Sequence, residues 1–222
     1  QPFPALSMIT GLVGNALGFD HAEFERLERL QERLSHASRQ DRRGERIEDY
    51  QTVDLGKDYM SDDRAWTTDG KLEQRAGASG GATHIRRRDY WAGAIHTVAL
   101  TLEPHDTSPT LDEIGEAIRR PERPLFIGRK NCLPAGELYL DTVEAPSLRD
   151  SLRRAPLPEE VAARADADSV TLPAWRPVTP DADDADARPV TDRRDWKNQI
   201  HVGERWIGRE RLEIEIPEDD DE

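Results

Sequence analysis

The sequence predicts an α+β protein whose helices and strands follow a ferredoxin-like order. Two observations favour this class. Apolar residues recur at helical spacing near the start of the chain, and from Ile47 onward the expected order is strand, projection, strand, helix, strand. A strand before Gln1 would complete the order βα followed by ββαβ, so we expect the first strand of the domain to be missing from this chain.

Two helices are expected first. Ser7 can cap a helix from Met8 to about Leu17, whose glycines would let it pack closely on a sheet. Asp20 and Glu23 form a plausible capping box for a second helix. The apolar residues of that helix recur at helical spacing and are Phe24, Leu27, Leu30 and Leu34.

Two strands flanking a projection are expected next. Gln40 to Arg46 is polar and predicts a loop, which leads into a strand near Ile47 to Val53. Asp54 to Ala82 is rich in glycine, aspartate and serine, and we expect it to be an extended hairpin projecting from the sheet. Thr83 to Leu102 is expected to form one long strand, because its second half is apolar and β-branched.

The rest of the domain is expected to contain one more helix and strand. Thr110 and Glu113 form a capping box for a short helix. The apolar residues Leu125 to Ile127 are expected to begin a strand. A turn at Gly128 would then present two cations, Arg129 and Lys130.

We expect residues 1–154 to form this domain, with the hairpin inserted at about 54–82. Ala155 to Asp192 is rich in proline, alanine and aspartate, which predicts an acidic linker or exposed loop. Residues 193–216 would carry a final pair of strands, at Trp196 to Ile216, and residues 217–222 an irregular acidic tail.

The formal net charge of −14, taken as a whole, argues against a nucleic-acid partner, but this charge is unevenly distributed along the chain. Glu159 to Ala187 and Glu213 to Glu222 have net charges of −6 and −7, whereas Arg188 to Leu212 has a net charge of +3. The acidity is therefore segmental and does not exclude a nucleic-acid groove on the folded part.

The cysteine and histidine content predicts a protein without a metal or other cofactor. Cys132 is the only cysteine, which excludes an internal disulfide and a cysteine-rich zinc site and fits a reducing cytoplasm. His96, His105 and His201 are isolated and lack ligand spacing. No run of residues has transmembrane length, so we expect a cytoplasmic protein without a membrane partner.

The first half of the expected long strand is the candidate binding site. Side-chain alternation places His84, Arg86, Arg88 and Tyr90 on one face of the strand. Guanidinium groups beside an aromatic ring suit a phosphate backbone with an unstacked base. The alternative interpretation is an exposed, charged strand end without a ligand.

Four motifs in this order resemble the CasD family, the fifth-family CRISPR-associated RAMP subunits of the type I-E Cascade complex. They are SMITGLVGNALG at 7–18, DYQTV at 49–53, RDY at 88–90 leading into VAL at 98–100, and FIGRKNC at 126–132. The likeness runs from Pro4 to about Leu152. It implies a ferredoxin-like (RAMP, RRM-like) domain whose inserted thumb corresponds to Asp54 to Ala82.

The resemblance also implies a function as a non-catalytic RNA clamp. Similar proteins bind the 5′ handle of the CRISPR RNA, cap the backbone filament and dock the large subunit, so target DNA would be met only through the complex. We expect Arg86, Arg88, Arg129 and Lys130 to contact phosphates, with His84 beside them and Tyr90 stacked on a base. Trp66 of the thumb would contact the neighbouring backbone subunit.

Two alternative functions stay open. One is a metal-independent endoribonuclease that processes precursor CRISPR RNA, using His84, or Tyr50 with Lys57, as the acid and base. The other is a protein-interaction adaptor without direct RNA recognition, which the net charge of −14 favours mildly.

Overall fold

The computed structural model describes residues 1–20, 22–54, 65–66, 72–73, 83–163, 168–179 and 186–216, the side chains of 53–54, 65–66, 72–73 and 83–84 excepted. The chain divides into two compact units. We call residues 1–42 and 95–222 the body unit and residues 43–94 the hairpin unit.

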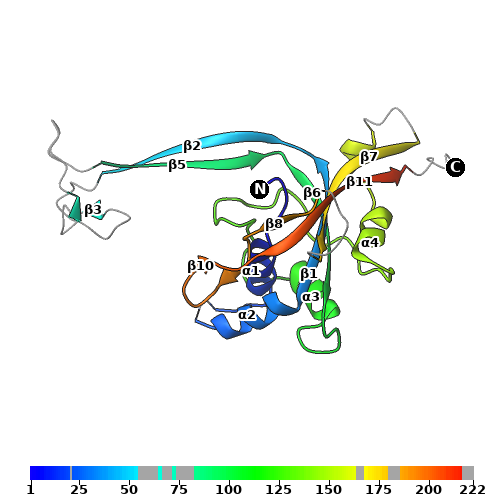
Figure 1. Cartoon of the computed structure of the whole chain (residues 1–222), viewed down its shortest axis with the longest axis horizontal. Helices are drawn as coiled ribbons and strands as arrows, with labels where there is room; N and C mark the ends of the chain where they lie inside the picture. Colours follow the sequence, from blue (N-terminus) through cyan, green and yellow to red (C-terminus); the bar gives the residue numbers. More distant parts are fainter. Residues whose placement is uncertain are drawn as a thin grey trace. The chain divides into compact units, whose positions relative to one another are not determined.

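The body unit is built on a five-stranded antiparallel sheet (Figure 1). Its strands lie in the order β6-β1-β7-β11-β8. Their bounds are Ile95–Leu102 for β6, Leu34–Arg42 for β1, Ser169–Val178 for β7, Arg205–Glu215 for β11 and Arg188–Val190 for β8. β9 (Arg194–Asp195) and β10 (Ile200–His201) form a separate two-stranded pair.

Three helices pack on one face of this sheet: α1 (Leu6–Ala16), α2 (Phe24–Arg33) and α3 (Leu111–Arg119). Their buried side chains form a core with Leu34 and Leu102 of the sheet. The two N-terminal helices approach closely at Gly14, where a Cβ atom would lie 2.5 Å from Leu27 Cδ2. The close approach at Gly14 is therefore to a neighbouring helix, whereas the sequence predicted close packing on a sheet.

The opposite face of the sheet packs against α4 (Leu148–Arg154), and α5 (Glu159–Ala162) follows it. Leu152 of α4 lies with Ala37, Leu172 and Leu212 in a second core. Arg39 is also buried at this face, and its side chain is fully covered. Arg39 Nε donates to Asp41 Oδ1 at 2.5 Å, and its Nη atoms donate to Thr97 Oγ1 and to the carbonyl oxygens of Leu152, Ala155 and Pro156.

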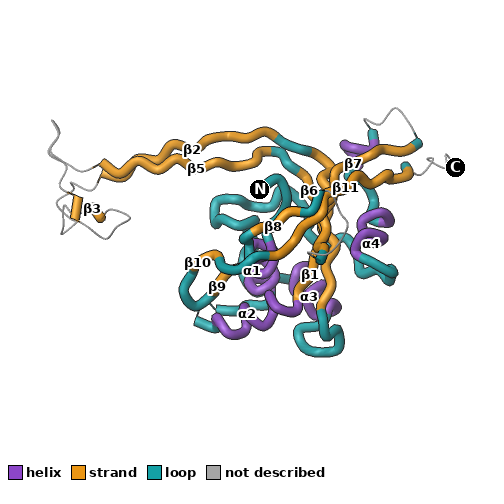
Figure 2. The backbone as a smooth tube through the Cα atoms, viewed as in Figure 1, coloured by secondary structure: helices purple, strands orange, loops and turns teal. Residues whose placement is uncertain are grey.

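The hairpin unit contains two pairs of strands (Figure 2). β2 (Glu45–Asp54) and β5 (Thr83–Ala92) pair antiparallel along their whole length, and β3 (Ala65–Trp66) pairs with β4 (Leu72–Glu73). The two strands that flank the expected hairpin at 54–82 therefore pair with each other. The other residues of the expected thumb at 54–82 lie outside the described residues.

The single strand expected over Thr83 to Leu102 is wrong. Gly93, with a positive φ of 65°, separates β5 from β6, and the two strands belong to different units. The loop expected at Gln40 to Arg46 is also wrong over most of its length, because β1 continues to Arg42 and β2 begins at Glu45. Neither β1 nor β2 has the continuous apolar pattern by which a buried strand is recognised in a sequence.

Three further expectations are corrected after the third helix. Leu125 to Ile127 forms a loop rather than a strand, although the expected turn at Gly128 is present with φ 76°. Ala155 to Asp192 is not only a linker, because β7 and β8 lie within it and pair with the central sheet. The final strands do not pair with each other, since β11 pairs with β7 and β8 while β10 pairs with β9.

The helix starts agree only partly with their predicted caps. The capping box of Thr110 and Glu113 is confirmed. Ser7 does not cap α1; instead Leu6 N donates to Asp192 Oδ2 at 3.0 Å. Asp20 N donates to Glu23 Oε2 at 2.7 Å as a capping box requires, but α2 begins only at Phe24.

The mixed α+β class is confirmed by these elements. Among the described residues, no helix combines the length and apolarity needed to cross a membrane.

Candidate nucleic-acid interface

One face of β5 carries three of the predicted RNA contacts. Arg86, Arg88 and Tyr90 alternate with residues of the other face, as expected from strand geometry. Across the ribbon they lie opposite Gln51, Asp49 and Ile47 of β2 respectively. Arg88 therefore stands beside a carboxylate, which itself accepts a hydrogen bond from Gln51 Nε2 at 2.6 Å. A phosphate bound by Arg88 would share that guanidinium with Asp49.

The other face of the ribbon also combines arginine and aromatic side chains. The Arg87 guanidinium lies 5.7 Å from the centre of the Tyr50 ring and 3.7 Å from Glu48 Oε1. The residues Tyr50 and Trp91 are 54% and 46% exposed. Exposed rings beside a guanidinium can accept unstacked bases, so both faces of the ribbon have the composition of a single-strand binding surface.

Arg129 and Lys130 lie in the body unit, on the turn after Gly128. Both are exposed, and the turn is closed by Ile127 N, which donates to the Cys132 carbonyl oxygen at 2.7 Å. A Cβ atom on Gly128 would lie 3.4 Å from Met8 Cγ, so the turn rests against α1. The predicted cations therefore fall into two groups, one in each unit of the chain.

Two predicted site residues have side chains outside the described part. They are His84 and Trp66, of which only the backbone is described, Trp66 pairing with Leu72. Lys57, named in the nuclease alternative, lies outside the described residues altogether.

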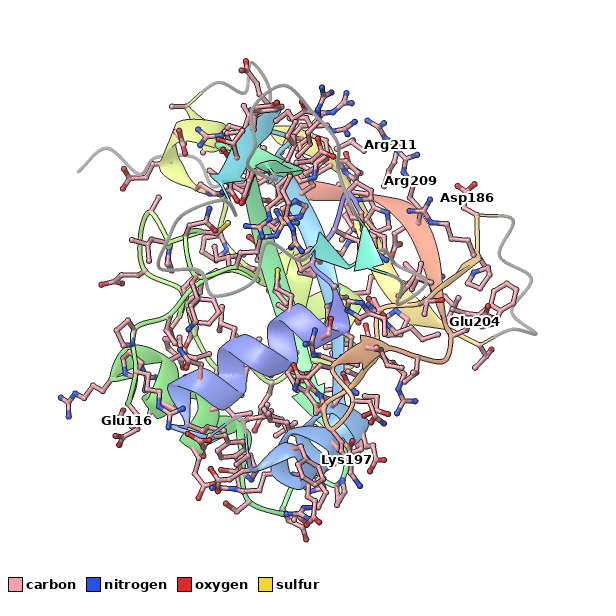
Figure 3. The ribbon with its side chains drawn as sticks, turned by 90° about the vertical axis from the view of Figure 1, so that its left-hand side faces the viewer. Glu116, Asp186, Lys197, Glu204, Arg209 and Arg211 are labelled. Atoms are coloured by element: carbon pink, nitrogen blue, oxygen red, sulfur yellow. The ribbon has the colours of Figure 1, made fainter. Side chains whose placement is uncertain are left out.

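Sequence reasoning did not predict the second face of the ribbon as an RNA contact, and it named Tyr50 only for the nuclease alternative. Tyr50, Arg87 and Trp91 share the second face of the ribbon, which the register of β2 on β5 defines. Side-chain alternation along β5 was the signal that could have found Arg87 and Trp91, because it places them on the face opposite to Arg86. Two further exposed cations, Arg209 and Arg211, project from β11 on the same side of that strand (Figure 3).

The histidines of the body unit differ in their surroundings. His36 is 3% exposed, and burial lowers its pKa to about 4, aided by the nearby Arg205 guanidinium. Its Nε2 lies 3.0 Å from the Pro4 carbonyl oxygen, so Nε2 is the protonated nitrogen that donates. Burial also lowers the pKa of His96. His201 is exposed, and its Nε2 lies 3.3 Å from Ser7 Oγ.

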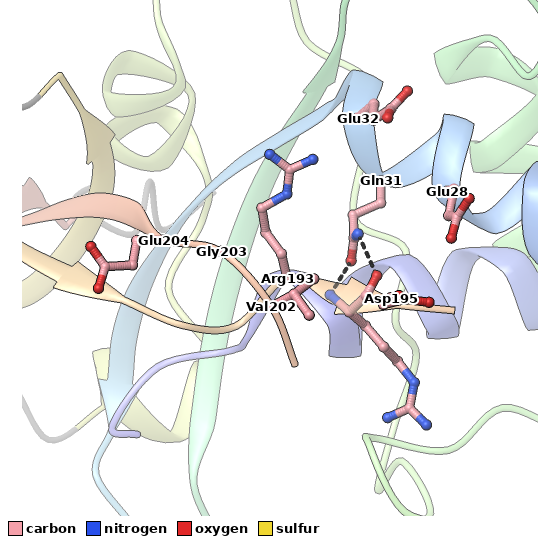
Figure 4. Close-up of a pocket in the computed structure, with 9 residues that line it drawn as sticks. Glu28, Gln31, Glu32, Arg193, Asp195, Val202, Gly203 and Glu204 are labelled. Atoms are coloured by element: carbon pink, nitrogen blue, oxygen red, sulfur yellow. Dashed lines mark hydrogen bonds between the residues drawn. The ribbon is translucent and has the colours of Figure 1, made fainter. Parts of the chain in front are cut away.

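A shallow hollow of about 280 Å³ lies between α2 and the β9 and β10 region (Figure 4). Gln31 of α2 connects the two sides of the hollow. Its side-chain amide donates a hydrogen bond of 2.9 Å to the Arg194 carbonyl oxygen and accepts one of 3.0 Å from Arg194 N. Its lining is Glu28, Gln31, Glu32, Arg193, Arg194, Asp195, Val202, Gly203 and Glu204. The mixture of acids and arginines does not favour a phosphate. Among the described residues, no three metal-ligating side chains gather.

The fold of this chain is similar to the folds of proteins from CRISPR systems. One solved structure, "CRISPR RNA-guided surveillance complex", matches with a TM-score of 0.66 at 25% identity over 97% of this chain and 81% of that chain. A second, "Crystal structure of Cas protein", has a TM-score of 0.56 at 21% identity over 96% of this chain and 82% of that chain, and supports the fold alone.

The sequence comparisons identify the family. A family model described as CRISPR-associated protein (Cas_Cas5) matches residues 1–208, so the chain belongs to this family. The "CRISPR system Cascade subunit CasD" of Escherichia coli (strain K12) is 31% identical over 152 residues. That alignment covers 68% of this chain and 63% of the relative, less than two thirds of its length. The predicted resemblance to the CasD family is confirmed.

Proposed function

We propose that this protein is a CRISPR RNA-binding subunit of a type I-E Cascade complex, which holds the 5′ handle without cleaving it. It would cap the backbone filament beside the large subunit and meet target DNA only through the complex. Family membership supports the assignment to a CRISPR complex. The observation that carries RNA binding is the placement of Arg86, Arg88 and Tyr90 on one face of an exposed two-stranded ribbon.

Each of these side chains has a separate task. Arg86 and Arg88 lie two residues apart on a strand, about 7 Å along it, so each guanidinium would bind a different phosphate. Tyr90 is half-buried beside Ile47 and follows Arg88 on the same face of β5. Its ring would stack on a base next to the phosphates that the two arginines bind. Asp49 lies opposite Arg88 and offsets part of its positive charge. RNA binding by the ribbon would therefore depend on where the arginine side chains are placed, and less on the net charge of the ribbon.

Arg129 and Lys130 would supply a second, independent phosphate contact from the body unit. Both are exposed on a hydrogen-bonded turn within the motif FIGRKNC, so the backbone of this turn presents the two cations next to each other. We also propose that the body unit is ferredoxin-like, on the grounds that β1 and β6 are antiparallel neighbours covered on one face by α1 and α3. A single cysteine supports a reducing, cytoplasmic location.

The test is the salt dependence of RNA binding. End-labelled CRISPR repeat RNA is titrated with the full chain and with Arg86→Gln/Arg88→Gln or Arg129→Gln/Lys130→Gln over a range of KCl concentrations. Each double variant should lower the slope of log affinity against log salt by about 1.4, because each phosphate contact contributes about 0.7 for a single strand. Arg29→Gln/Arg120→Gln is the matched control, since both arginines are well exposed, Arg29 within α2 and Arg120 directly after α3. Unchanged slopes in both variants would favour the adaptor alternative.

The absence of cleavage is a separate part of the proposal. The buried His36 and the half-buried His96, whose pKa values are lowered, are suited to neutral structural roles, whereas His201 and its neighbour Ser7 are accessible. Repeat RNA incubated with the protein in EDTA should stay intact on a denaturing gel. A shortened product would support the nuclease alternative, and its loss in His201→Ala or His84→Ala would identify the base.

A further inference from the structure

The segment from Arg188 to Leu212 has a net charge of +3 in a chain of net charge −14, and the proposed handle site uses none of it. The tertiary structure decides where this positive charge lies. Arg209, Glu210 and Arg211 are consecutive in β11, so strand alternation puts both arginines on one face and the glutamate on the other. The charges of opposite sign are thereby separated across the sheet.

Two of the four acids in this segment form ion pairs with arginines other than Arg209 and Arg211. Glu210 lies on the α4 side of the sheet, where its carboxylate pairs with Arg149 Nε at 2.7 Å and with Arg176 Nε at 3.2 Å. Asp192 is 2% exposed and accepts two hydrogen bonds of 2.7 Å from Arg205. Neither carboxylate can therefore neutralise Arg209 or Arg211.

A third arginine joins the two on the same face. Arg188 of β8 pairs in register with Ile207 of β11, so it lies diagonally next to Arg209. The Arg188 guanidinium lies 5.8 Å from the centre of the Phe3 ring, which packs with Ile207 on that face. We call Arg188, Arg209 and Arg211 the arginine strip.

The side chains of the arginine strip are exposed and make few contacts with polar groups of the described residues. All three residues are exposed, and Figure 3 shows Arg209 and Arg211 projecting outward. Within the described part of the chain none of the three forms an ion pair, and Arg211 Nη2 makes one long hydrogen bond of 3.4 Å to the Thr171 carbonyl oxygen. Glu213, the next residue of β11 on this face, is engaged by Ser169 Oγ at 3.1 Å.

We propose that the arginine strip binds the phosphate backbone of single-stranded RNA at a second place, separate from the predicted handle contacts. Three guanidinium groups in a row on adjacent strands suit consecutive phosphates, which arginine binds through paired N–H groups. The aromatic rings beside the strip, Phe3 and Trp175, are 5% and 5% exposed and cannot stack on bases. The contact therefore positions RNA without reading its sequence.

The inference rests on the proposed RNA-binding function, and its test separates the two. The full chain, Arg188→Gln/Arg209→Gln/Arg211→Gln and the charge-matched control Arg29→Gln/Arg120→Gln/Arg153→Gln are titrated with labelled repeat RNA and with a scrambled RNA at several KCl concentrations. The strip variant should lower the salt slope by about 2 for both RNAs, at about 0.7 per phosphate, while the control keeps the parent slope. Arg188→Lys/Arg209→Lys/Arg211→Lys should keep the slope, because it keeps the charge.

Each outcome has one meaning. If the parent binds RNA and the strip variant binds with the same slope, the strip proposal is overturned and the proposed function stands. If the parent binds neither RNA, both are overturned. If the strip variant binds RNA like the parent but no longer copurifies with the other subunits of the complex, the strip contacts an acidic protein surface and the RNA assignment is overturned. Equal thermal midpoints of all variants show that folding is not the cause.

Discussion

Replacing Arg39 by methionine should strongly destabilise the body unit. Arg39 is 0% exposed, and all its N–H groups point at acceptors on three different segments of the chain. Three of these acceptors are carbonyl oxygens at the end of α4 and just after it, so the guanidinium fastens that helix to β1. Methionine keeps the length of the aliphatic stem and removes only the polar head.

The magnitude follows from what the substitution leaves behind. The Asp41 carboxylate is fully covered and would keep only the hydrogen bond from Thr97 Oγ1, at 2.5 Å. Removing one partner of a buried ion pair costs about 3–5 kcal/mol, because the other charge stays buried without compensation. For a chain of this size each kcal/mol corresponds to about 2–4 °C, so we expect a midpoint lower by about 6–20 °C.

The assay is urea unfolding followed by tryptophan fluorescence, since Trp175 and Trp196 are buried in the body unit. A double-mutant cycle with Asp41→Asn isolates the pair: Arg39→Met/Asp41→Asn should be more stable than the sum of the single losses predicts, by at least about 1 kcal/mol. Arg153→Met, on the exposed side of α4, is the control and should stay within about 0.5 kcal/mol. An Arg39→Met protein within about 1 kcal/mol of the parent would refute the reasoning.

Three other predictions concern single positions. Burial lowers the pKa of His36 in the folded protein to about 4 from its ordinary value of 6.5, so the unfolded chain binds the proton first. The free energy of unfolding should therefore fall as the pH drops from about 6.5 to 4. The loss should be on the order of 3 kcal/mol, and His36→Gln should flatten this part of the curve of thermal midpoint against pH relative to the parent. Asp192→Ala should lower the free energy of unfolding, measured in urea, by about 3 kcal/mol, because it removes the acceptor of Arg205 and of the first N–H of α1. A loss below about 1 kcal/mol would contradict this role of Asp192. Gly44→Ala should destabilise the hairpin unit by about 1–3 kcal/mol, since φ of Gly44 is +69° and a Cβ atom would lie 2.6 Å from the Ala92 carbonyl oxygen. Amide hydrogen exchange of β2 and β5 should become faster. Unchanged protection of these amides would contradict the prediction.

The sequence determined those features that depend on neighbouring residues. The capping box of Thr110 and Glu113 is local, because both hydrogen bonds join residues three apart, and it was predicted correctly. The turn at Gly128 and the alternation that places Arg86 beside Arg88 on one face are local in the same sense. The motifs shared with the CasD family were also sufficient to predict the family that the comparisons identify.

Only the tertiary structure decided the features that depend on residues far apart in the chain. β1 is polar along much of its length, and Arg39 can be buried there because acceptors 113 and 117 residues away in the chain satisfy its side chain. Asp192, in a segment predicted as a linker, supplies the cap of a helix that begins 186 residues earlier. The arginine strip likewise exists only because β8 and β11 pair and because alternation turns Glu210 to the other face of the sheet. Composition and periodicity describe each residue by its neighbours in sequence, whereas the cost of burying a charge is set by partners that only the folded chain brings near.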